Sequence, residues 1–566
     1  MEKSQNRQKI GVVEIISTGF NYIDDILSLG YEPLVIEGHY IGKEDEIKPF
    51  KDAQMTMSKK AKDRGITVIP DTEDYNEMLA KVKEYNPIII VAGSEFGVPL
   101  ATRLADDLGL PGNSAKNIKA MTEKAAMHDA LKNYGIRYIK GRLVTSIDDA
   151  SSYYDELGTE NVVVKRTRGA GTQGVFLCQG KEEAMNAVRS LLNDTVKNGD
   201  EDVGILMQQR IIGTEYIVNT VSCNGKHRLA SIWRYEKMRL PNGTNAYINS
   251  ETVNKLDAGL TRLIRYAYDV VDAIGIKYGP IHGEYMIDEN GPVLIEVNCR
   301  PMGAGLPRKY TEQIFGHHET DIALDAYLNP HKFEIDKNKL YRPLRKGILK
   351  LFAITQDTNV ESAPILPICN RLKSMYKGVF DRIGREDIFL MTSNLETVGG
   401  VIYLVHDDER VVESDNDLLH LIEMKYPKLL FQNTDNQKQP NADRNIEKII
   451  RSVKDYGRTL VVTDTNVTAD GVTIIGLDEL KNAYDSFEQG ILDLSKEESF
   501  ADLESIFQQI YQFSDKIRQG GRIIIPESTY QHIPYGCDGM EILLIVAGFR
   551  IEVPLAEAGN IIVASK

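Results

Sequence analysis

Residues 281–305, IHGEYMIDENGPVLIEVNCRPMGAG, carry charged and amide side chains on a stretch that is otherwise hydrophobic. The runs EYMI and VLIEVN are typical of strands, and the turn-forming DENGP between them predicts a β-hairpin. Because alternate strand residues point to the same side, Glu296, Asn298 and Arg300 should share one face. Removing such groups from water is costly unless something offsets it, so this face is a candidate site for chemistry.

The predicted register of this hairpin sets two carboxylates against each other. With a turn centred near Asn290, Glu284 lies opposite Glu296. Facing carboxylates repel unless they are protonated or bridged by a cation, and hard oxygen ligands suit Mg²⁺ or Mn²⁺. A solvated polar face on an ordinary half-buried sheet is the alternative. The opposite, apolar face of the second strand should consist of Val293, Ile295 and Val297.

A glycine-rich loop joins two predicted strands in VVVKRTRGAGTQGVFL. Gly169, Gly171 and Gly174 let the backbone approach a ligand, and the N–H groups of such a loop can hold phosphate oxygens. Lys165 and Arg168 add positive charge beside them. The loop is not a P-loop, because GxxxxGK[ST] is absent and the loop leads from strand to strand. A glycine-rich hairpin alone is weak support for phosphate binding.

Two flanking segments could complete a nucleotide site. Lys124 lies near the start of the helix predicted for AMTEKAAMHDALKNYGI, where a surface lysine is the ordinary alternative. Downstream, GILMQQRIIGTEYIVNTVS predicts two strands on either side of Gly213. The extended QQRII stretch offers backbone donors and acceptors suited to an adenine edge, and Glu215 could hold ribose hydroxyls.

The first segment of the chain alternates strands and helices. KIGVVEII, YEPLVIEG, GITVIP and NPIIIVAG read as strands with helices between them, which predicts a parallel sheet with crossover helices. The loops of this first segment hold no GxGxxG motif, so a dinucleotide site there is disfavoured. Ser94 and Glu95 lie where a strand ends and a helix starts, a usual place for ligand contacts, although Ser94 could equally be a helix N-cap.

Composition describes an ordinary acidic globular protein. The 566 residues suggest three or four domains, and the net charge of −15 argues against nucleic acid or an anionic membrane as the main partner. No apolar run is long enough to span a bilayer, and the first residues are polar. The five cysteines are scattered without metal-ligand spacing, which favours a reduced, cytoplasmic setting.

Taken in order, these motifs resemble the ATP-grasp superfamily over residues 113–330, and the preceding segment resembles its N-terminal α/β domain. The chain is most similar to the carboxylate–amine ligases that include bacterial L-amino-acid (dipeptide) ligases, and the likeness covers roughly residues 8–430. The expected fold is α/β and multidomain, with a two-lobed ATP-grasp domain. The stretches that carry the resemblance are VAGSEFGVPLATRLADDLGLPGN, SIWRYEK, HGEYMI and EVNCRPMGAG.

The resemblance implies a role for each motif residue. Contacts to ATP are expected from Lys124, Lys165, the loop with Gly169, Gly171, Thr172 and Gly174, then Gln208, Gln209, Ile211 and Glu215. In that set the lysines and the loop would hold phosphates, Gln208 and the backbone of Gln209 and Ile211 the adenine, and Glu215 the ribose. A carboxylate is more common at the position of Gln208. One or two Mg²⁺ (or Mn²⁺) ions would be held by Glu284, Glu296 and Asn298.

The implied chemistry is amide formation through an acyl-phosphate. Lys165 and Arg300 would neutralise charge on the transferring phosphoryl group, while the role of His282, on the same strand face as Glu284, stays open between catalysis and structure. Products would be ADP, phosphate and an amide made from a small carboxylate and an amine, expected to be amino acids, in a homodimer. Candidate substrate contacts are Ser94, Glu95, Trp233, Arg234, Lys237 and Arg308. A charged strand edge is the alternative for Arg234 and Lys237.

Four domains are expected: an N-terminal α/β domain at 1–112, the ATP-grasp domain at 113–330, a C-terminal ligase lobe at 331–432, and a further domain at 441–566. In the lobe, GGVIYLVHDDERVVESDNDLLHLIE reads as strand, turn, strand, helix. The last domain resembles the later half of a class I methyltransferase sheet, with RIIIP, ILLIVAGF and NIIVAS as strands. It lacks the glycine-rich AdoMet loop, which indicates a degenerate domain for docking, dimerisation or regulation.

Two alternatives remain open. A carboxylase-like or carbamoyl-phosphate-type ATP-grasp enzyme would activate bicarbonate, but no Met-Lys-Met biotin-carrier segment occurs. A nucleotide-binding scaffold could recruit a partner through its C-terminal domain, yet a scaffold has no need of the metal ligands that this chain retains.

Overall fold

The computed structural model divides into two compact units. One unit holds residues 1–349, 393–396 and 405–409, and the other holds 350–392, 397–404 and 410–566. No helix among the described residues is long and apolar enough to cross a membrane. The structure describes residues 7–40, 44–166, 175–198, 204–240, 245–303, 305–360, 362–363, 365–386, 388–425, 430–431, 446–453, 457–463, 467–483, 486–494, 503–530, 536–552 and 561–566.

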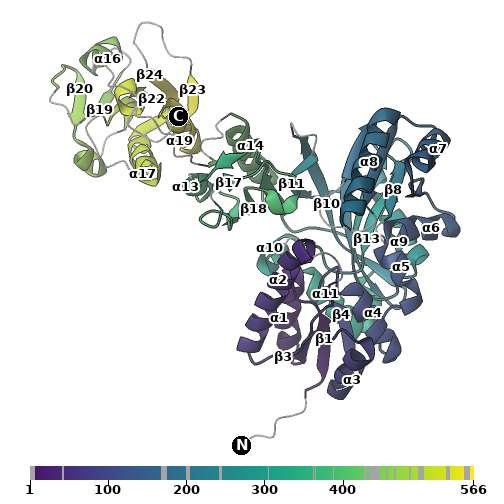
Figure 1. Ribbon diagram of the computed structural model, residues 1–566. Coiled ribbons are helices and arrows are strands. Elements are labelled where there is room, and N and C mark those ends of the chain that lie inside the picture. The colour runs from purple at the N-terminus through teal and green to yellow at the C-terminus, as the bar shows by residue number, and fades with distance from the viewer. Residues whose placement is uncertain are drawn as a thin grey trace, which may run out of the picture. The chain divides into compact units, whose positions relative to one another are not determined.

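The N-terminal segment forms a parallel sheet, as predicted, and its four strands have the order β3-β2-β1-β4 (Figure 1). Apolar residues of α1 and α2 pack in one core cluster and those of α3 and α4 in another, so both faces of the sheet are covered. The strands are β1 (Lys9–Val13), β2 (Glu32–Ile36), β3 (Thr67–Ile69) and β4 (Ile89–Ala92). The helices are η1 (Ser17–Phe20), α1 (Asn21–Ser28), α2 (Glu44–Asp63), α3 (Tyr75–Tyr85) and α4 (Val98–Asp107).

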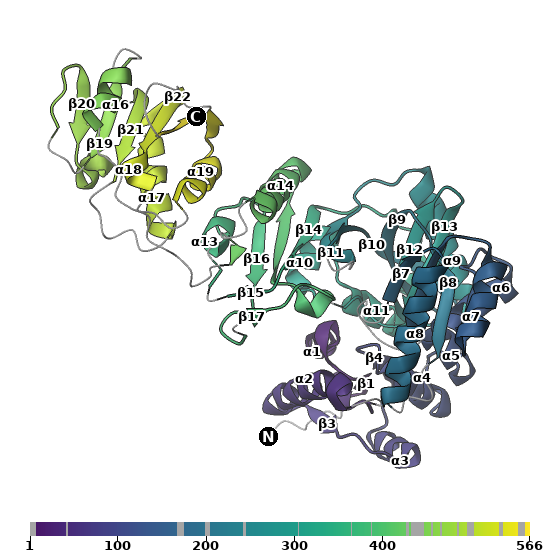
Figure 2. The same cartoon turned by 45° about the horizontal axis from the view of Figure 1, so that its top comes forward.

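A small lobe follows, with a four-stranded antiparallel sheet in the order β5-β8-β6-β7. Helices α7 and α8 lie beside this sheet (Figure 2). Val162, Val164 and Met207 pack with them on one face, so strand alternation leaves Lys165 and Gln208 on the other. The strands are β5 (Gly141–Val144), β6 (Asn161–Arg166), β7 (Val175–Gln179) and β8 (Ile205–Gln209). The helices are η2 (Ala115–Asn117), α5 (Ile118–Thr122), α6 (Lys124–Tyr134), α7 (Ile147–Leu157) and α8 (Lys181–Asn198).

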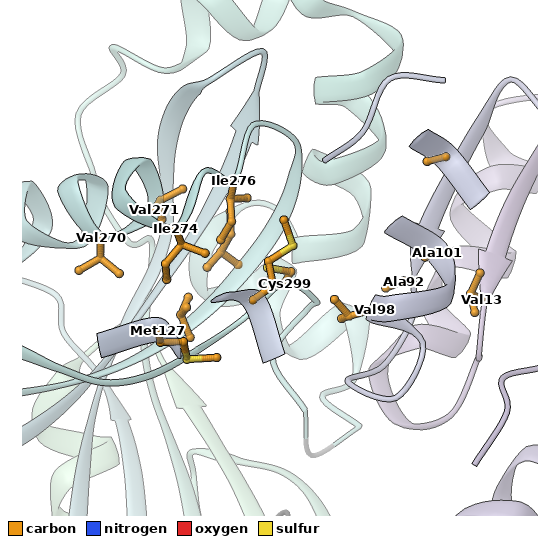
Figure 3. Packing of buried hydrophobic residues seen from close by; sticks show 14 of the residues in the cluster. Val13, Ala92, Val98, Ala101, Met127, Val270, Val271, Ile274, Ile276 and Cys299 are labelled. Carbon is orange, nitrogen blue, oxygen red and sulfur yellow. The ribbon is translucent and has the colours of Figure 1, made fainter. Parts of the chain in front are cut away.

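A larger sheet contains the strand order β13-β12-β9-β10-β11-β14, in which the neighbours from β13 to β11 pair antiparallel. Its core is continuous with that of the N-terminal domain, since Val13, Ala92 and Val98 join one cluster with Val270 and Cys299 (Figure 3). The strands are β9 (Thr214–Cys223), β10 (Lys226–Arg239), β11 (Asn245–Thr252), β12 (Gly279–Asp288), β13 (Gly291–Asn298) and β14 (Lys346–Phe352). The helices are α9 (Ala258–Ile274), α10 (Arg308–Phe315), α11 (Glu319–Leu328) and α12 (Pro330–Asp336).

The hairpin β12–β13 contains a bulge that alters the expected faces. Glu284 does pair with Glu296, as predicted, but only because the register shifts by one residue next to Tyr285. Without that shift Glu284 would face Ile295. The same shift places Leu294, with Val297, in the core cluster. The expected alternation of Val293 and Ile295 with Val297 was therefore wrong.

The second unit begins with a short lobe in which β16 and β18 pair antiparallel. The expected second strand at ERVV was wrong: Glu409 starts the long helix α14 directly after β18. The buried Val412 of this helix shows why an apolar pair alone does not identify a strand. The elements are β15 (Thr358–Asn359), α13 (Ile365–Cys369), β16 (Met375–Val379), β17 (Ile388–Phe389), η3 (Leu395–Thr397), β18 (Gly400–His406) and α14 (Glu409–Lys425).

The C-terminal sheet has the order β20-β19-β21-β22-β24-β23, parallel except for β24. ILLIV, expected as a strand, lies in helix α19, whose buried Met540 and Leu543 pack inward; a continuous apolar run does not distinguish the two. The methyltransferase resemblance stays a prediction. The elements are α16 (Ile446–Val453), β19 (Thr459–Thr463), β20 (Val472–Ile475), η5 (Leu477–Asn482), β21 (Phe487–Asp493), α17 (Leu503–Ser514), β22 (Ile517–Pro526), α18 (Glu527–Tyr530), α19 (Gly536–Val546), β23 (Arg550–Glu552) and β24 (Ile561–Ser565).

Candidate active site

The end of the β12–β13 hairpin meets the start of α6. Lys124, the first residue of that helix, places its Nζ 2.6 Å from Oε2 of Glu296. Asn298 donates from Nδ2 to Oε1 of the same carboxylate at 3.3 Å. Both charged side chains are largely enclosed, with 17% of Lys124 and 20% of Glu296 exposed. The predicted phosphate lysine and the predicted metal carboxylate are thus in direct contact.

The ionisation of this pair follows from its surroundings. Burial opposes the charge on Glu296, but the charge and hydrogen bond of Lys124, together with the charge of Lys165, lower its pKa to about 2. Burial would also lower the pKa of Lys124, yet the same contact with Glu296 outweighs it and raises that pKa above its usual value. Both groups are therefore charged at neutral pH.

Lys165 approaches the same site from β6 in the small lobe. Burial, followed by the charge of Lys124, lowers the pKa of Lys165 to about 8, while Glu296 and Glu284 oppose that shift. The nearby carboxylates only partly offset the cost of burying the charge of Lys165, so an anion such as a phosphate would stabilise its charged form. The predicted loop contacts lie outside the described residues: Gly169, Gly171, Thr172 and Gly174.

His282 is buried beside the hairpin carboxylates. Its Nδ1 lies 2.9 Å from Oδ1 of Asn219, and its Nε2 lies 3.5 Å from Oε1 of Glu284. Asn219 in turn donates to Oγ of Ser231 at 2.9 Å. The imidazole is thereby held between the sheet and a candidate metal ligand, which suits orienting Glu284.

Arg300 connects the hairpin to the N-terminal domain. Its guanidinium lies 3.3 Å from Oε2 of Glu95, so the two predicted site residues meet. Ser94 is not a helix N-cap, because α4 starts at Val98 with Gly97 as its cap. Ser94 instead donates a hydrogen bond to a carboxylate that the sequence analysis did not single out, Glu14.

Glu14 directly follows the first strand of the parallel sheet and is fully buried. Burial raises its pKa to about 7, against hydrogen bonds from Ser94 and the Gly97 backbone. Its backbone lies in the left-handed region, with φ of 62°. A carboxylate at the carboxyl end of a parallel strand was the available signal, since ligands bind at that edge of such sheets.

The predicted adenine residues lie on or just after β8 of the small lobe, and the predicted ribose residue, Glu215, lies on β9 beside β12. Gln208 is buried, and its Oε1 has no hydrogen-bond partner among the described residues. The N–H of Gln209 already donates to the carbonyl of Lys140 at 2.8 Å. Ile211 follows the end of β8 and is half-buried. The carboxylate of Glu215 accepts from Nζ of Lys237 at 2.6 Å.

The remaining substrate candidates already have partners within the protein. Lys237 pairs with Glu215, as above. Arg234 donates from Nε to Glu251 at 2.6 Å, and Arg308 lies 3.1 Å from Oδ1 of Asp25. Each of these basic side chains is therefore paired with an acidic residue of the protein. To bind a substrate carboxylate, each would first have to break that ion pair.

Trp233, the single tryptophan, is buried and lines a small cavity. Its Nε1 donates to Oγ of Ser231 at 3.1 Å, and its ring packs edge-on against Phe315 at 5.6 Å. Met302, two residues beyond Arg300, also lines this cavity. The cavity is therefore lined in part by the segment that follows the hairpin and Arg300.

The donor set fits a hard divalent cation. No group of three or more His, Cys, Asp and Glu side chains is arranged for a metal within the described ranges. The hairpin instead offers two carboxylates and an amide, from Glu284, Glu296 and Asn298. Mg²⁺ commonly takes only one or two protein carboxylates and completes its shell with phosphate oxygens and water. The residues present thus suit a metal that arrives with a nucleotide.

Comparisons with known proteins agree with this geometry. Residues 122–304 match the family model described as phosphoribosylglycinamide synthetase, ATP-grasp (A) domain. Dapdiamide A synthase of Enterobacter agglomerans is 29% identical over 329 residues, which cover 58% of this chain and 75% of that protein. The L-arginine-specific L-amino acid ligase of Bacillus subtilis is 22% identical over 271 residues, covering 46% of this chain and 64% of that protein.

The fold has a counterpart among solved structures. The crystal structure of an L-amino acid ligase from Bacillus licheniformis matches with a TM-score of 0.56 and 18% identity. The match covers 73% of this chain and 97% of that one. The predicted α/β multidomain architecture and the ATP-grasp resemblance are confirmed. Residues 122–304 thus match an ATP-grasp domain, and the chain is similar to synthases and amino-acid ligases in sequence and fold.

Proposed function

We propose that this ligase uses ATP and Mg²⁺ to convert a small carboxylate into an acyl-phosphate, which an amine then attacks to form an amide. The observation that carries the proposal is the meeting of Lys124, Glu296 and Asn298 at the hairpin end, with Lys165 approaching from the small lobe. Two cations and two carboxylates in one enclosed place suit a nucleotide phosphate with its metal.

Each residue has a distinct task in this scheme. Lys124 and Lys165 bind phosphate oxygens, and Gln208 with the backbone near Gln209 receives the adenine. Glu284, Glu296 and Asn298 would hold Mg²⁺, which when bound neutralises charge on the phosphates. Arg300 stands next to the metal ligands and stabilises charge on the group that is transferred.

The two steps balance in atoms and charge. A carboxylate oxygen of the first substrate attacks the γ-phosphorus, and ADP leaves. The amine nitrogen of the second substrate then attacks the acyl carbon, phosphate leaves, and the nitrogen loses a proton. Glu95 and Arg300, which meet at 3.3 Å, lie where the substrates would be held. The name of the L-arginine-specific L-amino acid ligase supports amino acids as substrates.

Screening amino acids and small carboxylates in pairs for release of ADP and phosphate tests the proposal. An amide product with stoichiometric ADP is expected for at least one pair. Stoichiometric AMP and pyrophosphate would contradict the acyl-phosphate route. ADP release that depends on bicarbonate alone would favour a carboxylase-like enzyme instead.

A further inference from the structure

His128 lies one helical turn after Lys124 on α6. Only 6% of the residue is exposed, and neither ring nitrogen has a hydrogen-bond partner in the part of the chain that the structure describes. Buried polar groups are almost always hydrogen-bonded, so a fully unpartnered buried imidazole is exceptional. Such a group is a candidate for contact with a ligand that the protein chain itself does not supply.

Other enclosed histidines show what the fold provides elsewhere. His282 contacts Asn219 at 2.9 Å, and His318 contacts Asp25 at 2.9 Å. His227 lies 2.7 Å from Oγ of Ser222 and 3.1 Å from a carboxylate oxygen. In each case a side chain contacts at least one ring nitrogen. His128 differs from these three histidines, because neither of its ring nitrogens has a hydrogen-bond partner among the described residues.

The helix α6 has an apolar face in the core and a polar face directed at the candidate site. Met127 and Leu131 belong to the core cluster. Lys124 and His128 are four residues apart and therefore share a face, and Lys124 on that face contacts Glu296 at 2.6 Å. Because α6 packs against both β13 and β5, this face lies where the hairpin and the small lobe meet.

The charges around His128 are cationic. Burial, followed by the charges of Lys165 and Lys124, lowers its pKa to about 4. The imidazole is therefore neutral at physiological pH and adds no third positive charge between the two lysines. A neutral imidazole still carries one N–H donor, which can bind an anion once it has entered.

We propose that His128 is a phosphate-binding residue, whose ring N–H donates to a phosphate oxygen of the nucleotide held between Lys124 and Lys165. The inference rests on the proposed nucleotide site and adds a contact to it. The reacting atoms are not involved: His128 binds, and transfers no proton. Because the imidazole is neutral, it adds no further charge repulsion to that between Lys124 and Lys165 when the site is empty. Its ring N–H remains available to donate a hydrogen bond to the bound anion.

Calorimetric titration of the full chain with ADP in EDTA tests this contact without metal or substrates. For His128→Leu we expect affinity for ADP to fall about tenfold to a hundredfold, the scale of a lost hydrogen bond to a charged group. His128→Gln keeps an N–H donor and should recover most of that loss. His227→Leu, which removes an enclosed histidine with protein partners, should lower thermal stability and leave ADP affinity unchanged.

Adenosine provides the matched ligand, because it lacks phosphates. Its affinity should be the same for the wild type and for His128→Leu. An equal loss for adenosine and ADP, or wild-type ADP affinity in a folded His128→Leu protein, would overturn the proposal. If the wild type itself binds no ADP, the proposed nucleotide site fails as well, so the two failures are distinguishable.

Nitrogen NMR of histidine-labelled protein gives a readout that a structural role would not move. The chain has ten histidines, and the signals absent from His128→Gln identify those of His128. Saturation with ADP should shift the protonated ring nitrogen of His128 in the direction of a stronger hydrogen bond. Ring signals that stay in place on ADP saturation would show that the partner is a buried water and refute the contact.

Discussion

Replacing Glu296 with Gln separates the two roles assigned to the hairpin end. The change removes one charge and little volume. Lys124 loses the anion that now lies 2.6 Å from its Nζ, while Asn298 can still hydrogen-bond to the new amide. If Glu296 is a metal ligand that restrains a phosphate-binding lysine, the variant should have opposite effects on nucleotide binding with and without Mg²⁺.

The magnitudes follow from the contacts. Breaking a fully buried ion pair costs about 3–5 kcal/mol. Because a fifth of this pair is exposed and Glu284 remains nearby, we expect the free energy of unfolding to fall by about 1–3 kcal/mol. Turnover with Mg²⁺ should fall more than about a hundredfold, the scale of a lost preorganised charge. Without metal, ADP should bind up to about tenfold more tightly, since Lys124 no longer has to leave Glu296.

The pH dependence has a definite sign. The folded pKa of Glu296, about 2, lies below its unfolded value of about 4.3. Its stabilising contribution is therefore fully present above pH about 4.3 and is lost as the pH falls towards 2. Urea unfolding of the wild type and Glu296→Gln should give a constant difference from pH 5 to 8, and that difference should shrink below about pH 4.

The assays are calorimetric ADP titration in EDTA and in Mg²⁺, with ADP release measured on the substrate pair found by screening. Asp288→Asn is the matched control, since that carboxylate lies on the same hairpin and pairs with Arg137 at 2.6 Å. The control should lose stability and keep ADP affinity in both conditions. Weaker ADP binding by Glu296→Gln in EDTA, or near-normal turnover with saturating Mg²⁺, would refute the reasoning.

Three further changes test other parts of the structure. Lys165→Met should raise the free energy of unfolding at pH 7 by up to about 3 kcal/mol, and this gain should fade between pH 8 and about 10.4. The variant should also bind ADP more weakly. A variant less stable than the wild type would contradict the lowered pKa of Lys165. Gly141→Ala would set a Cβ 2.6 Å from the Cβ of Gln208, the predicted adenine residue, which would have to shift. Calorimetry should then show that ADP and adenosine both bind about tenfold more weakly. Unchanged affinities would argue against an adenine site at Gln208. A truncated chain of residues 1–435 should still release ADP, and sedimentation should show an oligomeric state different from that of the full chain. Calorimetric titration of the full chain with AdoMet should show no binding. Micromolar AdoMet binding, or a truncated chain that is soluble but inactive, would overturn the role given to the tail.

Local patterns in the chain were enough to predict the hairpin and the pairing of its two carboxylates. Alternation predicted one face for Glu296 and Asn298, and turn residues located the reversal, whereas Arg300, expected on the same face, lies beyond the end of β13. Strand–helix alternation likewise predicted the parallel N-terminal sheet. These properties depend on neighbours within a few residues, so they can be read without knowing what packs against them.

Long-range contacts decided the rest. The bulge that sets Glu284 against Glu296 depends on how β12 and β13 settle in the sheet, and a turn alone does not fix it. ILLIV became a helix because continuous apolar runs suit a buried helix or strand equally. The approach of Lys124 to Glu296 joins residues 172 positions apart in the chain. Such encounters, and the raised or lowered pKa values that follow from them, depend on burial and on distant charges, which only the folded chain brings together.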